Sequence, residues 1–228
     1  AAPQGRPQGR PQGQRRVQLI AIGAPAYTGL PIVGAPAGLA SLRWAPLPNA
    51  GREMHDVGAL FARSERTIVT GEAATRERLL ALNASGELAA ARYLLVSAHA
   101  YLASQPQWSS IVLGGRGGYV TAGEIATFDL DADLVVLSAC ETALGRDVPG
   151  EGLYGLPFAF AMAGARRTML TLWSVDDASA SKFIPAFFAK LVRGASPADA
   201  LARTKREFMR DPRYSAPFHW APYVLVGG

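Results

Sequence analysis

The sequence predicts an α/β protein in which a mostly parallel sheet is covered by helices. Two apolar runs, residues 93–99 and 134–140, have the composition of strands that are buried on both faces, as the central strands of a parallel sheet are. Helical patterns alternate with such strands along most of the chain, which is typical of an α/β sandwich. The two runs end on His99 and Cys140, and sites in open α/β sheets form where parallel strands have their carboxyl ends.

Composition and charge exclude several classes of protein. The 228 residues are 49% hydrophobic, which is enough for one domain with a well-filled core. No run of about 18 uncharged apolar residues is present, so we expect no membrane contact. The net charge is +5, but residues 1–16 hold four arginines and no acid, so the rest of the chain carries only +1. We therefore expect no specific nucleic-acid partner.

A single cysteine cannot form an internal disulfide, which is compatible with a cytoplasmic protein. With only three scattered histidines beside it, we expect no metal site and no cofactor. Residues 1–16 contain the repeat Pro-Gln-Gly-Arg and are predicted to be a disordered linker that follows an upstream domain absent from this chain. Residues 17–228 are predicted to be a single domain.

The first half of the domain is expected to begin with a strand at 17–22, followed by Pro- and Gly-rich loops at 23–50. Apolar residues at helical spacing and short β-prone runs then set the order of elements. These are a helix over 51–63, a strand over 67–70, a helix over 73–82 and the strand that ends at His99.

In the second half, glycines 114–118 predict the turn of a hairpin within 100–120, and Thr121 with Glu124 predicts a capping box. Ser196 followed by Pro197 predicts the start of the last helix. The other expected elements are the strand ending at Cys140, a loop over 145–152, a helix over 153–163 closed by Gly164, a strand over 167–173, a helix over 177–193 and a closing strand over 219–226.

Several short blocks then carry a family resemblance. They are residues 47–50 (Leu-Pro-Asn-Ala), 98–99 (Ala-His), 137–145 (Leu-Ser-Ala-Cys-Glu-Thr-Ala-Leu-Gly), 150–153, 163–165, 172–177 and 220–227. Over residues 46–228 the chain resembles a CHAT domain, the bacterial branch of the caspase–separase cysteine peptidases. The resemblance implies a caspase-like three-layer α/β/α sandwich and a His–Cys dyad. It also implies that helical repeats precede the domain in a longer protein.

The predicted chemistry is peptide hydrolysis of a protein substrate. His99 would take the proton of the Cys140 thiol and later protonate the leaving amine. The backbone N–H groups of Cys140 and Ala100 are candidates to stabilise the oxyanion. Since no Asp or Asn is clearly placed as a third member, a backbone carbonyl is the candidate to orient His99.

Three further residues have weaker assignments. By resemblance to the separases, Asp176 or Asp177 would select a basic side chain at the cleavage site, although Asp177 is equally placed to cap the following helix. Glu151 would order the loop after Cys140, or would be a plain exposed acid.

Two alternatives remain open at this point. The family normally has glycine after the histidine, and Ala100 would be strained if that position required a positive φ. This departure favours a pseudopeptidase that serves as a protein-interaction module. The second alternative is another cysteine enzyme, such as an amidase, on a doubly wound sheet.

Overall fold

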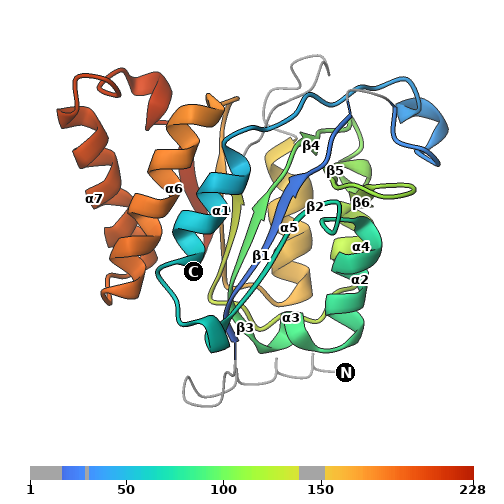
Figure 1. Ribbon diagram of the computed structural model, residues 1–228, viewed down its shortest axis with the longest axis horizontal. Helices are drawn as coiled ribbons and strands as arrows, with labels where there is room; N and C mark the ends of the chain where they lie inside the picture. The colour runs from blue at the N-terminus through green and yellow to red at the C-terminus, as the bar shows by residue number, and fades with distance from the viewer. Residues whose placement is uncertain (1–16, 29–30, 139–151) are drawn as a thin grey trace, which may run out of the picture.

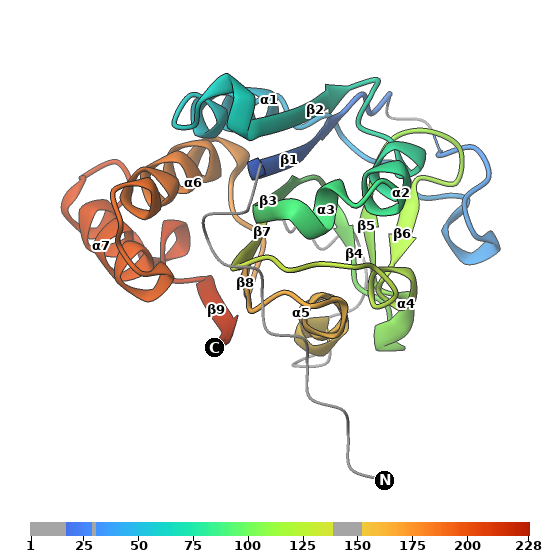
Figure 2. The ribbon, with the colours of Figure 1, turned by 90° about the horizontal axis from the view of Figure 1, so that it is seen from below.

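The computed structural model describes residues 17–28, 31–138 and 152–228. The predicted linker at 1–16, Cys140 and Glu151 lie outside the described residues. The domain has three layers, with a mixed sheet between two sets of helices (Figure 1). Viewed along the strands, α1, α6 and α7 cover one face of the sheet, and α2, α3 and α5 cover the other (Figure 2). This is the predicted α/β architecture.

The main sheet has six strands in the order β2-β1-β3-β7-β8-β9. All neighbours are parallel except β9, which pairs antiparallel with β8. The strands are β1 (Val17–Pro25), β2 (Arg66–Gly71), β3 (Ala91–Ser97), β7 (Leu134–Ser138), β8 (Arg167–Thr171) and β9 (Tyr223–Gly227). The two apolar runs therefore lie side by side at the centre of the sheet, as their lack of polar alternation predicts.

The helices that cover the sheet follow the predicted order, with shorter bounds in places. They are α1 (Ala50–Gly58), α2 (Arg76–Ala84), α3 (Glu87–Ala90), α4 (Ala122–Ile125), α5 (Gly152–Ala163), α6 (Asp177–Val192) and α7 (Pro197–Arg210). Both predicted caps are confirmed: Thr121 and Glu124 form a capping box, and Ser196 caps α7. No helix in this described part of the chain is long and apolar enough to cross a bilayer.

A small antiparallel sheet stands beside the main one. It consists of β4 (Ala100–Tyr101), β5 (Ser110–Val112) and β6 (Tyr119–Thr121), with β5 in the middle. Short 3₁₀ turns occupy residues 37–39, 63–65, 106–108 and 217–219. The predicted hairpin is β5–β6, whereas β4 was not expected because two residues give no periodicity to recognise.

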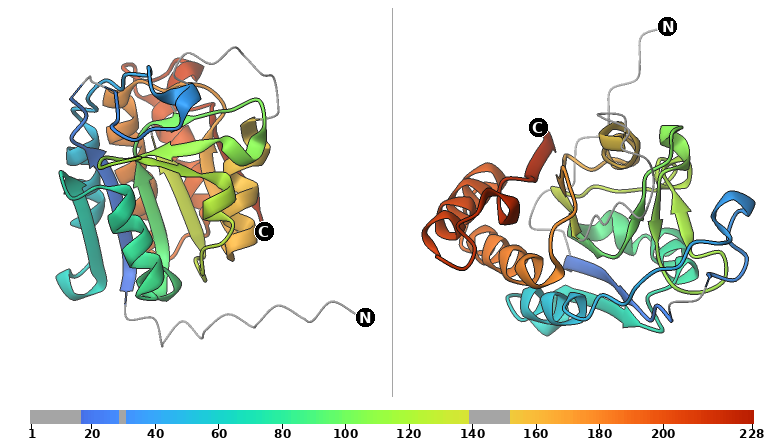
Figure 3. Two further views of the ribbon diagram at one scale, coloured as in Figure 1. Left: turned by 90° about the vertical axis from the view of Figure 1, so that its right-hand side faces the viewer. Right: turned by 90° about the horizontal axis from the view of Figure 1, so that it is seen from above.

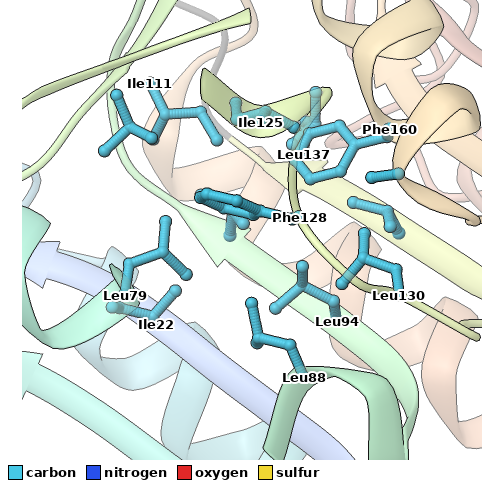
Figure 4. Packing of buried hydrophobic residues seen from close by; sticks show 14 of the residues in the cluster. Ile22, Leu79, Leu88, Leu94, Ile111, Ile125, Phe128, Leu130, Leu137 and Phe160 are labelled. Carbon is cyan, nitrogen blue, oxygen red and sulfur yellow. The ribbon is translucent and has the colours of Figure 1, made fainter. Parts of the chain in front are cut away.

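The pleat of the central strands divides the core into two clusters. Leu94 and Val96 of β3 belong to the cluster on the side of α2 and α5. Figure 4 shows Leu94 in this cluster with Leu79 of α2, Phe160 of α5 and Phe128, which follows α4. Tyr93 and Leu95 point to the opposite face, toward the helices α1, α6 and α7. Since side chains alternate along a strand, Ser97 belongs to the same face as Tyr93 and Leu95.

Some predicted boundaries were wrong. The strand predicted to end at His99 ends at Ser97, and the strand predicted over 167–173 ends at Thr171. The helix predicted over 51–63 ends at Gly58, a position where the absence of a Cβ leaves room for Ile68 Cδ1 of β2. The closing strand starts at Tyr223, while His219 lies in a 3₁₀ turn.

A register shift at the end of β1 redirects the chain toward the carboxyl edge of the sheet. A Cβ on Gly23 would lie 2.1 Å from the carbonyl oxygen of Ser97, so only glycine allows β1 to approach β3 this closely. The next residue, Ala24, has a positive φ of 45°, and the pairing of β1 with β2 shifts register between Ile22 and Pro25. After this bulge, the described residues 26–28 and 31–45 lie at the carboxyl edge of the sheet (Figure 3, right).

We expect Gly23→Ala to lower the free energy of unfolding by more than about 2 kcal/mol, because β1 and β3 must separate to admit the methyl group. Gly38→Ala is the matched control, since a Cβ there would meet nothing within 4 Å. Denaturant unfolding of both variants tests this. Equal stability of the two variants would contradict the close approach of the strands.

Candidate active site

The candidate site lies at the carboxyl edge of the two central strands. Ser97 and Ser138, the last residues of β3 and β7, are register partners in parallel strands. The ladder continues one step further, since the Ala98 N–H donates to the Ser138 carbonyl at 3.3 Å. His99 and Cys140 each follow these serines by two residues in the sequence. Parallel pairing in register therefore brings the start of both segments to one edge.

His99 is buried, with 1% of its surface exposed, and its ring packs against two aromatic residues. The ring centroid of Tyr27 lies 4.9 Å away and that of Trp44 lies 5.1 Å away, both tilted against the imidazole. The Nε2 atom lies 2.8 Å from the carbonyl oxygen of Ala45. A carbonyl only accepts hydrogen bonds, so this contact assigns the ring proton to Nε2 and the lone pair to Nδ1 in the neutral imidazole.

The Ala45 carbonyl is thus a backbone acceptor of the kind that was expected to orient His99 in place of an Asp or Asn side chain. It fixes both the tautomer and the plane of the ring. Trp44 is itself held, because its Nε1–H donates to the Tyr119 hydroxyl at 2.8 Å. Such an arrangement presents Nδ1 as the nitrogen able to accept a proton, which is the state that a general base requires.

The Tyr27 hydroxyl is inserted between β4 and β5 next to His99. The Val112 N–H donates to the His99 carbonyl at 2.8 Å, but the return bond from His99 to Val112 is replaced by a bridge. The His99 N–H donates to the Tyr27 oxygen at 3.2 Å, and the Tyr27 hydroxyl donates to the Val112 carbonyl. Burial raises the pKa of Tyr27 above its ordinary value, so the hydroxyl keeps the proton that this bridge needs.

The same ladder determines where the Ala100 N–H points. In an antiparallel pair, hydrogen-bonded and non-hydrogen-bonded pairs alternate. Since His99 and Val112 form a hydrogen-bonded pair, Ala100 and Ile111 form a non-hydrogen-bonded pair. The Ala100 N–H therefore points away from β5. Among the described residues, Ala24 is the non-glycine residue with a positive φ, so Ala100 adopts a conformation that suits alanine. The strain considered for an alanine at this position is therefore absent.

A buried carboxyl group lies beside the last residues of β3 and β7. Glu53 of α1 is 2% exposed, and the Ser138 hydroxyl donates to its Oε2 at 2.8 Å. Burial raises the pKa of Glu53 to about 8 from an ordinary value of 4.5, the two serine hydroxyls lower it, and the charge of Asp177 raises it. The Ser97 hydroxyl acts on this carboxyl although its geometry falls short of a hydrogen bond.

The two predicted pocket acids both have structural partners. Asp176, rather than Asp177, caps α6 and accepts a hydrogen bond from the Ser179 N–H at 2.9 Å. Asp177 accepts from both the backbone and the side-chain nitrogen of Asn49, each at 2.8 Å. These bonds join the start of α6 to the start of α1, and so fix the helix that carries Glu53.

Cys140 and Glu151 lie outside the described residues, so the geometry above concerns His99, Ala100 and their surroundings. Within the three described ranges, no cluster of His, Cys, Asp and Glu side chains is arranged as a metal-binding group. Sequence reasoning missed Tyr27, Trp44, Ala45 and Glu53. The first three lie in a Pro- and Gly-rich stretch without periodicity, and Glu53 was hidden in an amphipathic helix, where an acid is normally on the outer face.

Comparisons with known proteins identify the family and the fold of the chain. The family model of the CHAT domain matches residues 3–228. The chain therefore belongs to the CHAT domain family, and its fold is the caspase-like α/β sandwich that the sequence predicted.

Among individual proteins, tetratricopeptide repeat protein 28 of Mus musculus is 33% identical over 108 residues, which are 47% of this chain and 4% of that protein. The chain thus matches a small part of a much longer relative. The separase of the Saccharomyces cerevisiae separase–securin complex aligns with 93% of this chain and 12% of its own, at 16% identity and a TM-score of 0.57. The Drosophila initiator caspase Dronc aligns with 96% of this chain and 82% of its own, at 9% identity and a TM-score of 0.46.

We expect Tyr27→Phe to lower the free energy of unfolding by about 1–3 kcal/mol, because the His99 N–H and the Val112 carbonyl lose their bridge. Tyr101→Phe is a control on the neighbouring strand. Denaturant unfolding measures the loss of stability. Hydrogen exchange at the His99 amide should rise in Tyr27→Phe, and an unchanged exchange rate there would contradict the bridge.

We expect Glu53→Gln to change the pH dependence of stability. In the unfolded chain Glu53 loses its proton near pH 4.5, whereas the folded protein keeps it up to about pH 8. The unfolded state then binds fewer protons in this interval, so the free energy of unfolding falls as pH rises, by up to about 1.4 kcal/mol per pH unit.

Glu53→Gln should remove this fall, and the variant should gain stability over the wild type between pH 5 and pH 8. Glu65→Gln is the matched control because Glu65 is exposed. Denaturant unfolding at several pH values makes the comparison. Parallel curves for the wild type and Glu53→Gln would show that the carboxyl is not buried in its neutral form.

Proposed function

We propose that this domain is a cysteine endopeptidase that cleaves a protein substrate, with His99 and Cys140 as its dyad. The observation that supports this best is the state of His99. Its Nε2 is bonded to the Ala45 carbonyl, which leaves Nδ1 as the nitrogen that can accept a proton. His99 follows the end of β3 by two residues, and β3 pairs in register with β7, the strand before Cys140. Membership of the CHAT family and a fold shared with separase support the same proposal.

In the proposed reaction, His99 Nδ1 accepts the proton of the Cys140 thiol, and the thiolate attacks the peptide carbonyl carbon. The carbonyl π bond opens to give an oxyanion, for which the N–H groups of Ala100 and Cys140 are the proposed donors. The protonated His99 then gives its proton to the leaving amine as the C–N bond breaks. Water hydrolyses the thioester, and His99 takes a proton from that water and returns it to the thiolate.

The surroundings of the dyad suit these steps. The Ala45 carbonyl stabilises the imidazolium by accepting from Nε2–H, as the carboxylate does in a three-membered site. Tyr27 and Trp44 prevent the ring from turning, so the nitrogen that accepts the proton stays the same throughout the reaction. A held ring loses little conformational entropy when the transition state forms, which is an advantage for proton transfer.

The wider context is also a proposal. The matched relative is a tetratricopeptide repeat protein, and this supports an upstream helical-repeat domain that controls the peptidase. A cytoplasmic location, which is reducing, would keep Cys140 as a thiol. Asp176 and Asp177 remain candidates for selecting a basic side chain, although each also serves an N-terminal helix contact. Digestion of a peptide library tests that preference directly.

The second candidate function is a pseudopeptidase that acts as a binding module, which Ala100 suggested. The backbone of Ala100 weakens this alternative, because alanine is unstrained there and its N–H points away from β5. An active-site probe that alkylates thiols separates the two functions.

We expect iodoacetamide to label the wild-type protein at Cys140 with a pH-dependent rate that reflects proton loss to His99. His99→Ala should slow labelling at pH 7 by 10-fold or more, and Cys140→Ala should abolish both labelling and peptide cleavage. Ala100→Gly should change the rate less than threefold. A large rise in the rate for Ala100→Gly, from an inert wild type, would favour the pseudopeptidase.

A further inference from the structure

Glu53 occupies a position where an apolar residue would be expected. It lies on the sheet-facing side of α1 together with Met54 and Val57, which are fully buried against the sheet. Along β3 and β7 this face presents Leu95 and Val136, and each strand then ends in a serine. The carboxyl group therefore lies at the last layer of the helix–sheet interface, next to the carboxyl edge.

Glu53 is hydrogen-bonded to one central strand and lies near the end of the other. Its Oε2 accepts from Ser138 of β7 at 2.8 Å, and its carboxyl group is close enough to Ser97 of β3 for that hydroxyl to lower its pKa. Ser97 and Ser138 are opposite each other in the ladder. One side chain from α1 thus lies against the ends of two neighbouring strands at the same register position.

The start of α1 is fixed from a third direction. Asn49, the residue before α1, donates to Asp177 at the start of α6 through both its backbone and its side chain. Asp177 is also the charge that raises the pKa of Glu53. Because α1 is held at this end, Glu53 presents a fixed rather than a mobile carboxyl group to the two serines.

Burying this group is unfavourable for folding. A carboxyl in an apolar interface costs stability even when it is neutral and bonded, and an apolar side chain of similar size is often neutral or stabilising in its place. The Oε1 atom of Glu53 and the Ser97 hydroxyl are both buried without a hydrogen-bond partner among the described residues. Residues that lower stability in this way are typical of functional sites.

We propose that Glu53 is a positioning residue that joins the ends of β3 and β7 and thereby sets the separation of the segments that carry His99 and the nucleophile. The catalytic part of this inference rests on the proposed function, whereas the joining of the strand ends does not. The hydrogen bond from Ser138 to the Glu53 carboxyl group has a preferred length and direction, and it is formed next to Ser97, the register partner of Ser138. An apolar contact has no such preference. Displacements near 1 Å at reacting groups can change rates by about 100-fold.

Glu53→Met tests the proposal, because methionine is unbranched, similar in length and unable to form hydrogen bonds of comparable strength. We expect its free energy of unfolding at pH 7 to equal or exceed that of the wild type. Hydrogen exchange in peptides covering 91–98 and 133–138 should rise 10-fold or more. The kcat for a cleaved peptide, or the rate of Cys140 alkylation by iodoacetamide, should fall 10-fold or more with KM little changed.

Glu53→Gln should restore both readouts to within threefold of the wild type, because the amide keeps an acceptor and gains donors in the same shape. Val57→Ala is the matched control, because Val57 lies one turn further along α1, is buried against the same sheet and has no side-chain group that could hydrogen-bond to the serines. Its kcat and its exchange at the two strand ends should stay within threefold of the wild type. Ser138→Ala is a second route that leaves α1 unchanged, and it should raise the same exchange rates.

Hydrogen exchange at both strand ends that stays at the wild-type rate in Glu53→Met and Ser138→Ala would overturn the proposal. A fall of kcat in Val57→Ala as large as that in Glu53→Met would also overturn it. A Gln variant as impaired as the Met variant would also overturn it. If the wild-type protein neither cleaves peptides nor shows His99-dependent alkylation, the proposed function fails. In that case the exchange measurements still decide whether Glu53 joins the strands.

Discussion

The structure depends on one interaction, the parallel pairing of β3 with β7 at the centre of the sheet. Five register pairs run from Tyr93–Leu134 to Ser97–Ser138, and both strands are almost completely buried. Parallel pairing requires the connection between the strands to cross over, and the chain uses that crossover to build the small sheet and α4. The same pairing places the ends of both strands at one edge, so the core and the candidate site have a common cause.

His99 is held by elements that are remote from it in the sequence. The bulge at Gly23 and Ala24 turns the chain over the sheet edge, and this segment supplies Tyr27, Trp44 and Ala45 around the ring. These contacts include the backbone carbonyl of Ala45, which depends on the path of the chain rather than on residue type, and the inserted hydroxyl of Tyr27. The imidazole is positioned by a loop that has no regular structure over most of its length.

This division explains how much the sequence could predict. Long apolar runs, capping residues and helix-ending glycines act locally, so the central strands, α6, α7 and the capping box of Thr121 were found from the sequence. The surroundings of His99 depend on contacts between residues that are far apart in the sequence. The Ala45–His99 contact spans 54 positions, and the Tyr27–Val112 contact spans 85. The burial of Glu53 depends on how α1 sits on the sheet. No local pattern encodes either of these.

The junction at His99 has a mechanical consequence. β3 ends at Ser97 and β4 begins at Ala100, so two residues, Ala98 and His99, connect β3 of the main sheet to β4 of the small one. A connection of two residues cannot absorb a relative movement of the two strands, so any tilt of the small sheet would displace the imidazole of His99. A ligand that binds the small sheet and tilts it would thus change the position of the His99 ring.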